Sequence, residues 1–272
     1  MAKRAWVTLT TDFGTSDPYV AAMKGNILRH GPRAEIIDIT HDIPPHQIAQ
    51  GAFVLANAAP WFPAGTVHVV VVDPGVGTDR AILVGQFGGQ LFIFPDNGII
   101  TFIQQTLPME GLVSVKNLSF LKGAKVSNTF HGRDLMAPLA GYVLSGKSIA
   151  DLGMMPTRYK LLDLPQAYPL KSGLAGQVIY VDRFGNIVTN ITREQVESLR
   201  TPFDTLHVDC NGQHVSTIKG TYGFVDPGLP VSLFNSMDRL EIAINQSRAC
   251  DVFHGEVGSE IRVYAKPFIE AS

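Results

Sequence analysis

One short apolar segment limits the folds that this chain can adopt. Residues 67–72 have the sequence VHVVVV, and the segment stops at the tripeptide Asp73-Pro74-Gly75. A short run rich in β-branched residues predicts a buried strand, and Asp-Pro-Gly predicts that the strand ends abruptly. Asp73 is therefore expected at the carboxyl end of a strand, which is where open α/β sheets place their ligand sites.

Strand-like and helix-like segments alternate around this strand in the first half of the chain. Such alternation predicts an α/β domain with a central, mostly parallel sheet. A Gly-Gly turn at residues 88–89 predicts a hairpin within it. The expected strands are 5–10, 34–39, 67–72, 81–87 and 91–94, and the expected helices are 18–30, 45–59, 99–105 and 134–144.

The composition changes near residue 150. Residues 151–171 contain three prolines and few periodic runs, which predicts a linker between domain 1–150 and domain 172–272. Short strands between turns then predict a smaller C-terminal β-barrel or sandwich, with one helix at 193–200. These strands are expected at 177–181, 206–209, 214–218, 231–234, 240–244 and 260–265.

The overall composition excludes several classes of protein. Lys and Arg number 22 against 24 Asp and Glu, for a net charge of −2, so no basic face is expected for nucleic acid or a membrane surface. The two cysteines, Cys210 and Cys250, are far apart and are expected to be reduced thiols. No apolar stretch reaches the roughly 18 residues of a membrane helix, and the basic N-terminus lacks the apolar core of a signal peptide. We therefore expect a cytoplasmic protein.

Three side chains form a candidate water-activating set. Asp73 and Arg80 belong to the segment DPGVGTDR, in which a Gly-rich turn returns the arginine towards the aspartate, and His131 belongs to NTFHGRD. The first segment lacks the Gly-Lys-Ser/Thr ending of a phosphate-binding loop and the GxGxxG pattern of a dinucleotide site. We therefore expect acid–base chemistry on water at this position.

Two loops after earlier strands carry further polar residues. Asp12 and Asp17 in TTDFGTSDPYV suit recognition of hydroxyl groups such as those of ribose. Asp17 is equally well interpreted as a helix cap, with Pro18 in the first helical position. His41 and His46 in THDIPPHQ lack the partners of a metal site, so this segment predicts a rigid turn.

The second half carries a candidate binding surface. Its polar and aromatic side chains lie beside predicted strands, and Phe184 and Tyr222 could stack on a flat base. An equally good interpretation of the sequence FGN at residues 184–186 is a β-turn. The candidates are Asp182, Phe184, Asn186, Tyr222, Ser236 and Glu241.

Together these segments resemble one family. TTDFGTSDPYV, THDIPPHQIAQG, VVDPGVGTDR, PDNG, NTFHGRD, VDRFGNIVTNI and FNSMDRLEIAIN resemble, in order, the S-adenosyl-L-methionine (SAM) hydrolases, also called SAM hydroxide adenosyltransferases. The resemblance implies an α/β domain followed by a β-barrel. It also implies a homotrimer that binds substrate between the N-terminal domain of one subunit and the C-terminal domain of the next. The implied reaction converts SAM and water to adenosine and L-methionine, without a metal or redox cofactor.

The resemblance also implies roles for the candidate residues. Asp73, Arg80 and His131 handle the water, and Asp12 binds the ribose with Asp17 nearby. The implied contacts to the methionine and adenine ends are Asp182, Phe184, Asn186 and Ser236, with Tyr222 and Glu241 as further candidates.

The related fluorinases differ at two positions, with a tyrosine in place of Asp73 and a serine in place of Gly132. Both differences favour water over halide as the nucleophile. A halide-dependent adenosyl transferase, a non-catalytic SAM or adenosine binding protein and a metal-dependent hydrolase remain alternatives. The proton acceptor is also open: His131 could take the proton while Asp73 and Arg80 orient the water, or Asp73 could take it while His131 positions the water.

Overall fold

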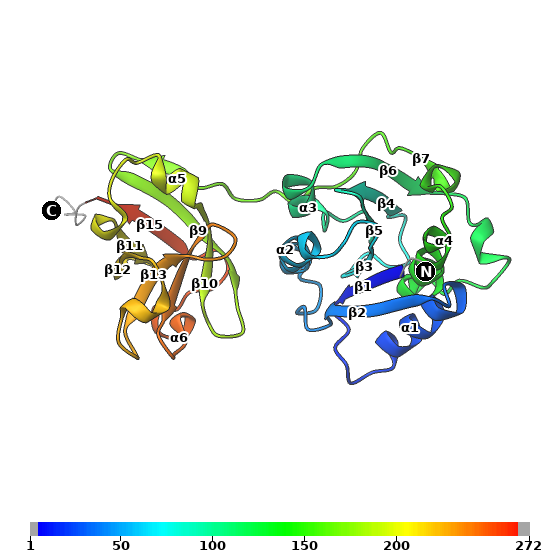
Figure 1. Cartoon of the computed structure of the whole chain (residues 1–272), viewed down its shortest axis with the longest axis horizontal. Helices are drawn as coiled ribbons and strands as arrows, with labels where there is room; N and C mark the ends of the chain where they lie inside the picture. The colour runs from blue at the N-terminus through cyan, green and yellow to red at the C-terminus, as the bar shows by residue number, and fades with distance from the viewer. Residues whose placement is uncertain (1–4, 266–272) are drawn as a thin grey trace. The chain divides into compact units, whose positions relative to one another are not determined.

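The structure is a computed structural model that describes residues 5–265. The chain divides into two compact units, the first ending at Leu162 and the second beginning at Asp163 (Figure 1). The outer ends of the two expected domains, residues 1–4 and 266–272, lie outside the described residues, as does the basic start of the N-terminal segment.

The described part of the first unit is built on a mixed seven-stranded sheet in the order β2-β1-β3-β5-β4-β6-β7. Strands β2, β1, β3 and β5 run parallel, whereas β4, β6 and β7 pair antiparallel with their neighbours. The hairpin between β4 and β5 reverses the chain and so makes the sheet mixed. The bounds are β1 Ala5–Thr11, β2 Ala34–Thr40, β3 Val67–Val71, β4 Ile82–Phe87, β5 Gln90–Pro95, β6 Met109–Val115 and β7 Gly153–Met154.

The helices of this unit follow the expected pattern, with later starts for the first three. The expected helix at 134–144 is instead a π-helix, η3, followed by the α-helix α4. The bounds are α1 Tyr19–His30, α2 Ile48–Ala58, α3 Thr101–Thr106, η3 Gly132–Met136 and α4 Ala137–Leu144, with short 3₁₀ turns at Ala59–Trp61, Ser119–Leu121 and Ile149–Leu152.

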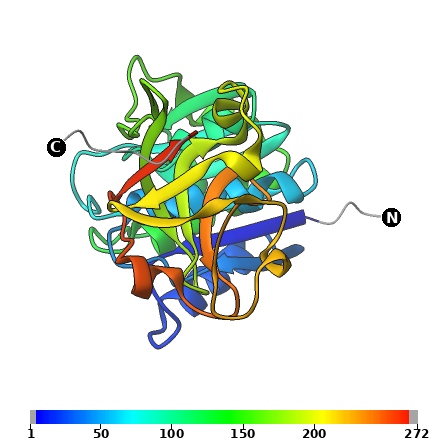
Figure 2. The same ribbon diagram turned by 90° about the vertical axis from the view of Figure 1, so that its left-hand side faces the viewer.

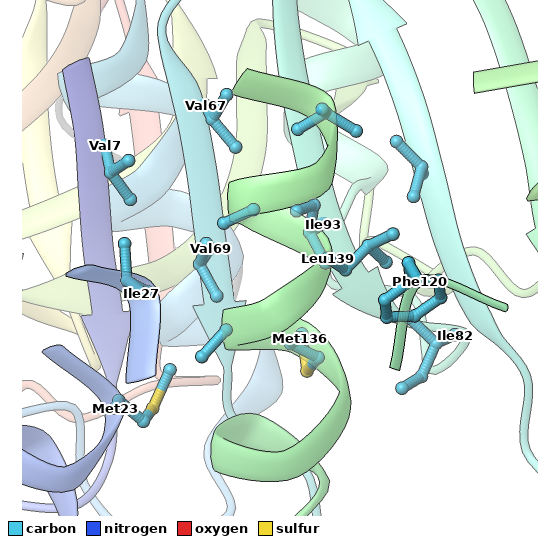
Figure 3. Packing of buried hydrophobic residues seen from close by; sticks show 14 of the residues in the cluster. Val7, Met23, Ile27, Val67, Val69, Ile82, Ile93, Phe120, Met136 and Leu139 are labelled. Atoms are coloured by element: carbon cyan, nitrogen blue, oxygen red, sulfur yellow. The ribbon is translucent and has the colours of Figure 1, made fainter. Parts of the chain in front are cut away.

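Helices α1 and α4 cover one face of the parallel strands (Figure 3). Because side chains alternate along a strand, Val67 and Val69 of β3 face these helices, where they share a buried cluster with Met23 and Leu139. His68, between the two valines, belongs to the opposite face and is also fully buried. Both faces of β3 are therefore covered, which explains its unbroken apolar sequence. Each large apolar side chain buried here contributes about 1.5–3 kcal/mol.

The second unit is a β-barrel, as expected. Within its described residues, β9 pairs with β10 and closes a ring of seven strands in the order β10-β14-β13-β12-β11-β15-β9. The short strand β8 pairs with the beginning of β9, on the edge opposite β15. These strands are coloured from green to red in Figure 2. The bounds are β8 Tyr168–Leu170, β9 Gly173–Val181, β10 Ile187–Thr192, β11 His207–Cys210, β12 Gln213–Lys219, β13 Pro230–Phe234, β14 Arg239–Ile244 and β15 Glu260–Tyr264.

Two short helices accompany the barrel, α5 Arg193–Glu197 and α6 Ala249–Phe253, with 3₁₀ turns at Phe203–Thr205 and Tyr222–Phe224. The expected helix at 193–200 is confirmed in its first part, where Thr192 and Gln195 form a capping box. The expectation of a single helix in this half is wrong, because α6 is a second one. Its five residues are too few to show a helical period, and Ala249 and Phe253 are fixed by packing into the barrel core.

No helix within residues 5–265 is both long enough and apolar enough to span a membrane.

Candidate functional site

The carboxyl ends of two parallel strands define a cavity in the first unit. Strands β1 and β3 are neighbours, so Asp12, directly after β1, and Asp73, two residues after β3, lie at the same edge of the sheet. A cavity of about 560 Å³ is found there. Its lining residues are Asp12, Phe13, Tyr19, Pro45, His46, Val71, Asp73, Val76, Ser127, Thr129, Phe130, His131, Gly132 and Arg133.

Asp73, Arg80 and His131 are brought into direct contact. Arg80 donates from Nε to Oδ1 of Asp73 at 2.9 Å and from Nη2 to Oδ2 of the same carboxylate. Its Nη2 also lies 2.9 Å from Nδ1 of His131. The side chains of Arg80 and Asp73 are only 6% and 4% exposed. The guanidinium is therefore a buried bridge between a carboxylate and an imidazole.

The contact with Arg80 fixes the tautomer of His131. Arginine can only donate hydrogen bonds, so Nδ1 of His131 must accept, and the proton of the neutral ring is on Nε2. Burial lowers the pKa of His131, and the positive charge of Arg80 lowers it further, although Asp73 and Asp134 oppose this. Asp73 and His131 line the cavity, whereas Arg80 is not among the described residues that do so.

The loop that carries Arg80 depends on close packing against the loop before His131. Gly77 has a φ of +80°, and a Cβ at this position would lie 2.5 Å from the carbonyl oxygen of Asn128. Only glycine meets both requirements. This close approach holds the segment 73–80 against the segment 127–131.

A π-helix begins directly after His131. Asp134 within it accepts a hydrogen bond from the backbone N–H of Ser127 at 2.9 Å and receives two bonds from Arg133 at 2.6 and 2.8 Å. Asn26 of α1 donates to the carbonyl oxygen of Arg133 at 2.6 Å. These bonds tie the loop before His131 and the helix after it to one another. π-Helical turns are frequent at functional sites.

Asp12 and His46 face the same cavity. Oδ2 of Asp12 accepts the backbone N–H of His46 at 2.9 Å, and His46 has a left-handed φ of +67°. Such a conformation is strained for a residue other than glycine and clusters at functional sites. The sequence predicted a turn for this segment, and the place of His46 on the cavity wall was not predicted. The run Pro44-Pro45 before it was the available signal.

The other expected residues of this unit lie elsewhere. Asp17 is exposed and is not among the described residues that line the cavity. Its alternative interpretation as a helix cap is wrong, because Pro18 is the N-cap of α1 and no described side chain caps this helix. His41 bonds Thr11 Oγ1 at 2.8 Å and lies 3.0 Å from Asp38 Oδ1. No group of three or more His, Cys, Asp or Glu within residues 5–265 is arranged to hold a metal ion.

Three aromatic rings form one wall of the cavity. Phe13, Tyr19 and Phe130 contact one another edge to face, with ring centroids 5.4–5.8 Å apart. None of the three was predicted as a site residue. Their position was the available signal, since Phe13 follows Asp12 and Phe130 precedes His131.

In the second unit, four expected residues line a separate hollow of about 650 Å³. Asp182 accepts hydrogen bonds from the backbone N–H of Asn186 at 2.8 Å and from its side chain at 3.0 Å. Gly185 has a φ of +83°, so the interpretation of FGN as a turn is confirmed. The aromatic ring of Phe184 is largely exposed. The lining residues are Asp182, Arg183, Phe184, Asn186, Tyr222, Ile244, Asn245, Gln246, Ser247 and Arg248.

Glu241 and Ser236 are not among the described residues that line this hollow. Glu241 is buried and accepts hydrogen bonds from Tyr222 Oη at 2.6 Å and from Asn235 Nδ2 at 3.1 Å. Burial raises the pKa of Glu241, and burial together with the Glu241 contact raises that of Tyr222. The carboxylate of Glu241 therefore fixes the position of the Tyr222 hydroxyl group. Ser236 is exposed on the turn between β13 and β14.

Comparison with known proteins gives one consistent result. The model of the SAM hydroxide adenosyltransferase N-terminal domain matches residues 7–153, and that of the C-terminal domain matches residues 176–262. A protein of Salinispora arenicola named (R)-S-adenosyl-L-methionine hydrolase is 36% identical over 268 residues, which cover 97% of this chain and 100% of that protein. A fluorinase of Actinopolyspora mzabensis is 25% identical over 291 residues, covering 96% of this chain and 97% of that enzyme.

A solved structure shares the fold. The crystal structure of an uncharacterized conserved protein from Thermotoga maritima superimposes with a TM-score of 0.88 at 33% sequence identity. The match covers 95% of this chain and 99% of that one.

Proposed function

This chain belongs to the SAM hydroxide adenosyltransferase family, as its motifs predicted, and we propose that it hydrolyses SAM to adenosine and L-methionine. The names of its relatives favour the (R) configuration at the sulfonium. The observation that carries the proposal is the contact set of Asp73, Arg80 and His131 at the cavity wall. It provides two different hydrogen-bonding groups for one water molecule.

The reaction is a substitution at the C5′ carbon of the ribose. The leaving group is a neutral thioether and needs no general acid. The nucleophile is the difficulty, because neutral water is weak. The site must hold one water in line with the carbon–sulfur bond and accept its proton.

Asp73 is the proton acceptor in this mechanism. Arg80 cannot accept a proton, and the accepting nitrogen of His131 already faces Arg80. The Nε2–H of His131 instead donates to the water and positions it. Asp73 keeps free lone pairs beside its two bonds to Arg80, and it lines the cavity. Of the two assignments that the sequence left open, this geometry supports Asp73 as the base.

Substrate binding would use both units. In the proposed assembly, a homotrimer, each substrate lies between the first unit of one subunit and the second unit of the next. Asp12 binds the ribose hydroxyl groups through the oxygen that His46 leaves free, and Asp17, exposed on the loop before α1, is a further proposed contact. The side chains proposed for the methionine and adenine ends are Asp182, Phe184, Asn186, Tyr222 and Ser236, and Glu241 acts through its hydrogen bond to Tyr222.

Halide is disfavoured as the nucleophile for two reasons. The carboxylate of Asp73 would repel an anion in the cavity. A Cβ on Gly132 would meet Sδ of Met23 and Cγ1 of Val71, each at 3.3 Å, so a serine side chain would not fit without movement of these neighbours. A hydroxyl group that could hold a halide is therefore missing at this position.

Chromatography of the purified protein after incubation with SAM, with and without chloride, tests the proposal. We expect adenosine and methionine in equal amounts, independent of chloride, and faster turnover of the (R) epimer. A chlorinated nucleoside would instead favour the halide-dependent reaction. Saturable binding without any product would favour a binding protein.

We also propose that the protein is located in the cytoplasm, which agrees with the free thiols of Cys210 and Cys250.

A further inference from the structure

The three rings on the cavity wall are not used by the mechanism above. Tyr19 is 46% exposed, and Phe13 and Phe130 are partly buried, packed against the core of the unit. Each ring contacts the other two edge to face, a geometry that fixes their relative orientation. The result is a rigid apolar wall in a cavity that also contains carboxylates.

The position of this wall matches the reacting part of the proposed substrate. Phe13 directly follows Asp12 and Phe130 directly precedes His131, so the rings lie beside the residues proposed for the ribose and the water. In-line attack places the sulfur opposite the water across C5′. The cavity that holds the ribose and the water must therefore also admit the sulfur, and the three rings line that same cavity.

The charges around the rings decide which of them can accept a cation. The guanidinium of Arg133 lies 4.9 Å from the ring centre of Phe130 and already covers that ring with a cation. Arg133 is itself neutralised by two hydrogen bonds to Asp134. Tyr19 is the most exposed of the three rings and is therefore the most accessible to a ligand in the cavity.

We propose that Tyr19, supported by Phe13 and Phe130, forms the subsite for the methylsulfonium group and selects a cation at that position. This inference rests on the proposed function, because the sulfonium belongs to the proposed substrate. A sulfonium carries its charge among apolar carbon atoms and is poorly hydrated. Aromatic faces bind such cations through the ring quadrupole, as they bind quaternary ammonium groups. The neutral thioether product lacks this attraction, so the subsite favours substrate over product.

Two ligands separate charge recognition from simple packing. S-Adenosyl-L-homocysteine has a neutral sulfur, and sinefungin carries an ammonium group in place of the methylsulfonium; neither has the sulfonium leaving group. Their dissociation constants are measured by calorimetry for the wild type and three variants. Tyr19→Leu removes the ring, Tyr19→Phe retains it, and Trp61→Leu changes an exposed ring that is not among the described residues lining the cavity.

We expect Tyr19→Leu to weaken sinefungin binding about three- to thirtyfold. The same variant should change the binding of S-adenosyl-L-homocysteine by less than twofold. Tyr19→Phe and Trp61→Leu should retain the wild-type ratio. Equal weakening of both ligands in Tyr19→Leu would overturn the inference and leave a packing role. A wild type that shows no preference for the cation, or binds neither ligand, would also overturn it.

The hydrolysis of SAM by the same proteins separates the two proposals. If the wild type hydrolyses SAM and Tyr19→Leu keeps the sinefungin preference, the function stands and the subsite fails. If the wild type gives no adenosine but Tyr19→Leu loses the preference, the subsite stands and the hydrolase proposal fails.

Discussion

Nη2 of Arg80 lies 2.9 Å from Nδ1 of His131, and this single contact determines which ring nitrogen carries the proton. Because the guanidinium only donates, the imidazole presents Nε2–H as its remaining polar group. The same arginine holds both oxygens of Asp73. Asp73 and His131, the proposed base and the proposed donor, are therefore positioned by one buried cation.

The proposed donor role of His131 predicts a difference between two substitutions. His131→Gln can present an N–H close to the position of Nε2, whereas His131→Ala cannot. We expect steady-state assays to show that His131→Gln retains at least tenfold more kcat than His131→Ala. Equal loss in the two variants would indicate that the imidazole itself accepts the proton.

The activity should decline in acid. The pKa of His131 lies below its ordinary value of 6.5 because of burial and the charge of Arg80. Protonation at Nδ1 would place two donors face to face and break the contact with Arg80. The profile of kcat/KM against pH should therefore stay level through neutrality and fall only below pH 6.5. A fall that begins above that pH would contradict the neutral tautomer.

Substitution of Arg80 should lower the stability of the protein. Arg80→Ala leaves the carboxylate of Asp73 buried without its partner, which costs about 3–5 kcal/mol of unfolding free energy. Arg193→Ala is the matched control, because Arg193 pairs with Asp238 at 2.7 Å on the surface, with side chains 38% and 71% exposed. Such a pair contributes at most about 1 kcal/mol. Urea denaturation of the two variants measures the free energy of unfolding that each loses. Similar losses would show that the buried Asp73–Arg80 pair contributes no more than a surface pair.

Gly77 provides a second matched comparison. Gly77 and Gly123 share a φ of +80°, but a Cβ at Gly77 would strike Asn128, whereas at Gly123 it would meet no atom within 4 Å. Gly123→Ala should cost about 1 kcal/mol for the backbone alone. Gly77→Ala should cost clearly more and should also lower kcat, because it separates the loops of Arg80 and His131. Equal costs in thermal or urea unfolding would count against this packing argument.

His68 predicts how stability depends on pH. Its imidazole is fully buried, bonds Thr8 Oγ1 at 2.7 Å and stacks on Phe92. Burial lowers its pKa from 6.5 to about 4. A lowered pKa means that the folded state favours the neutral imidazole. The stability that this preference contributes is fully present above pH 6.5 and is lost as the pH falls from 6.5 to 4. The loss should approach about 3 kcal/mol.

The control for this prediction is His214, which is exposed. Urea denaturation at pH 7.5 and pH 4.5 should show a smaller pH dependence for His68→Gln than for the wild type, and no change for His214→Gln. An unchanged pH dependence in His68→Gln would assign the effect to other groups.

Much of the fold followed from local patterns. The apolar run 67–72 predicted a buried strand, and β3 is buried along its whole length. Strand β6 was not predicted, because its sequence MEGLVSV begins with exposed residues and a glycine. Strand β10 was missed since the FGN turn signal directly before it dominated that segment. The π-helix at 132–136 was also missed, because it depends on tertiary bonds from Asn26 and Ser127.

The site was less accessible from the sequence. Their positions after predicted strands indicated Asp12 and Asp73 as site residues, because parallel strands bring the loops that follow them to one edge of the sheet. The contact from Arg80 to His131 spans 51 residues, and no local pattern gives the orientation of either side chain. The place of Tyr19 on the cavity wall is set in the same way by its packing against Phe13 and Phe130.

The most direct test of the account is the rate of SAM hydrolysis by Asp73→Asn, measured beside its affinity for adenosine. Asparagine keeps the shape of the side chain but cannot accept the proton. We predict a loss of kcat of roughly 10²–10⁴-fold, with the dissociation constant for adenosine changed by less than threefold. Turnover equal to that of the wild type would contradict the assignment of Asp73 as the base.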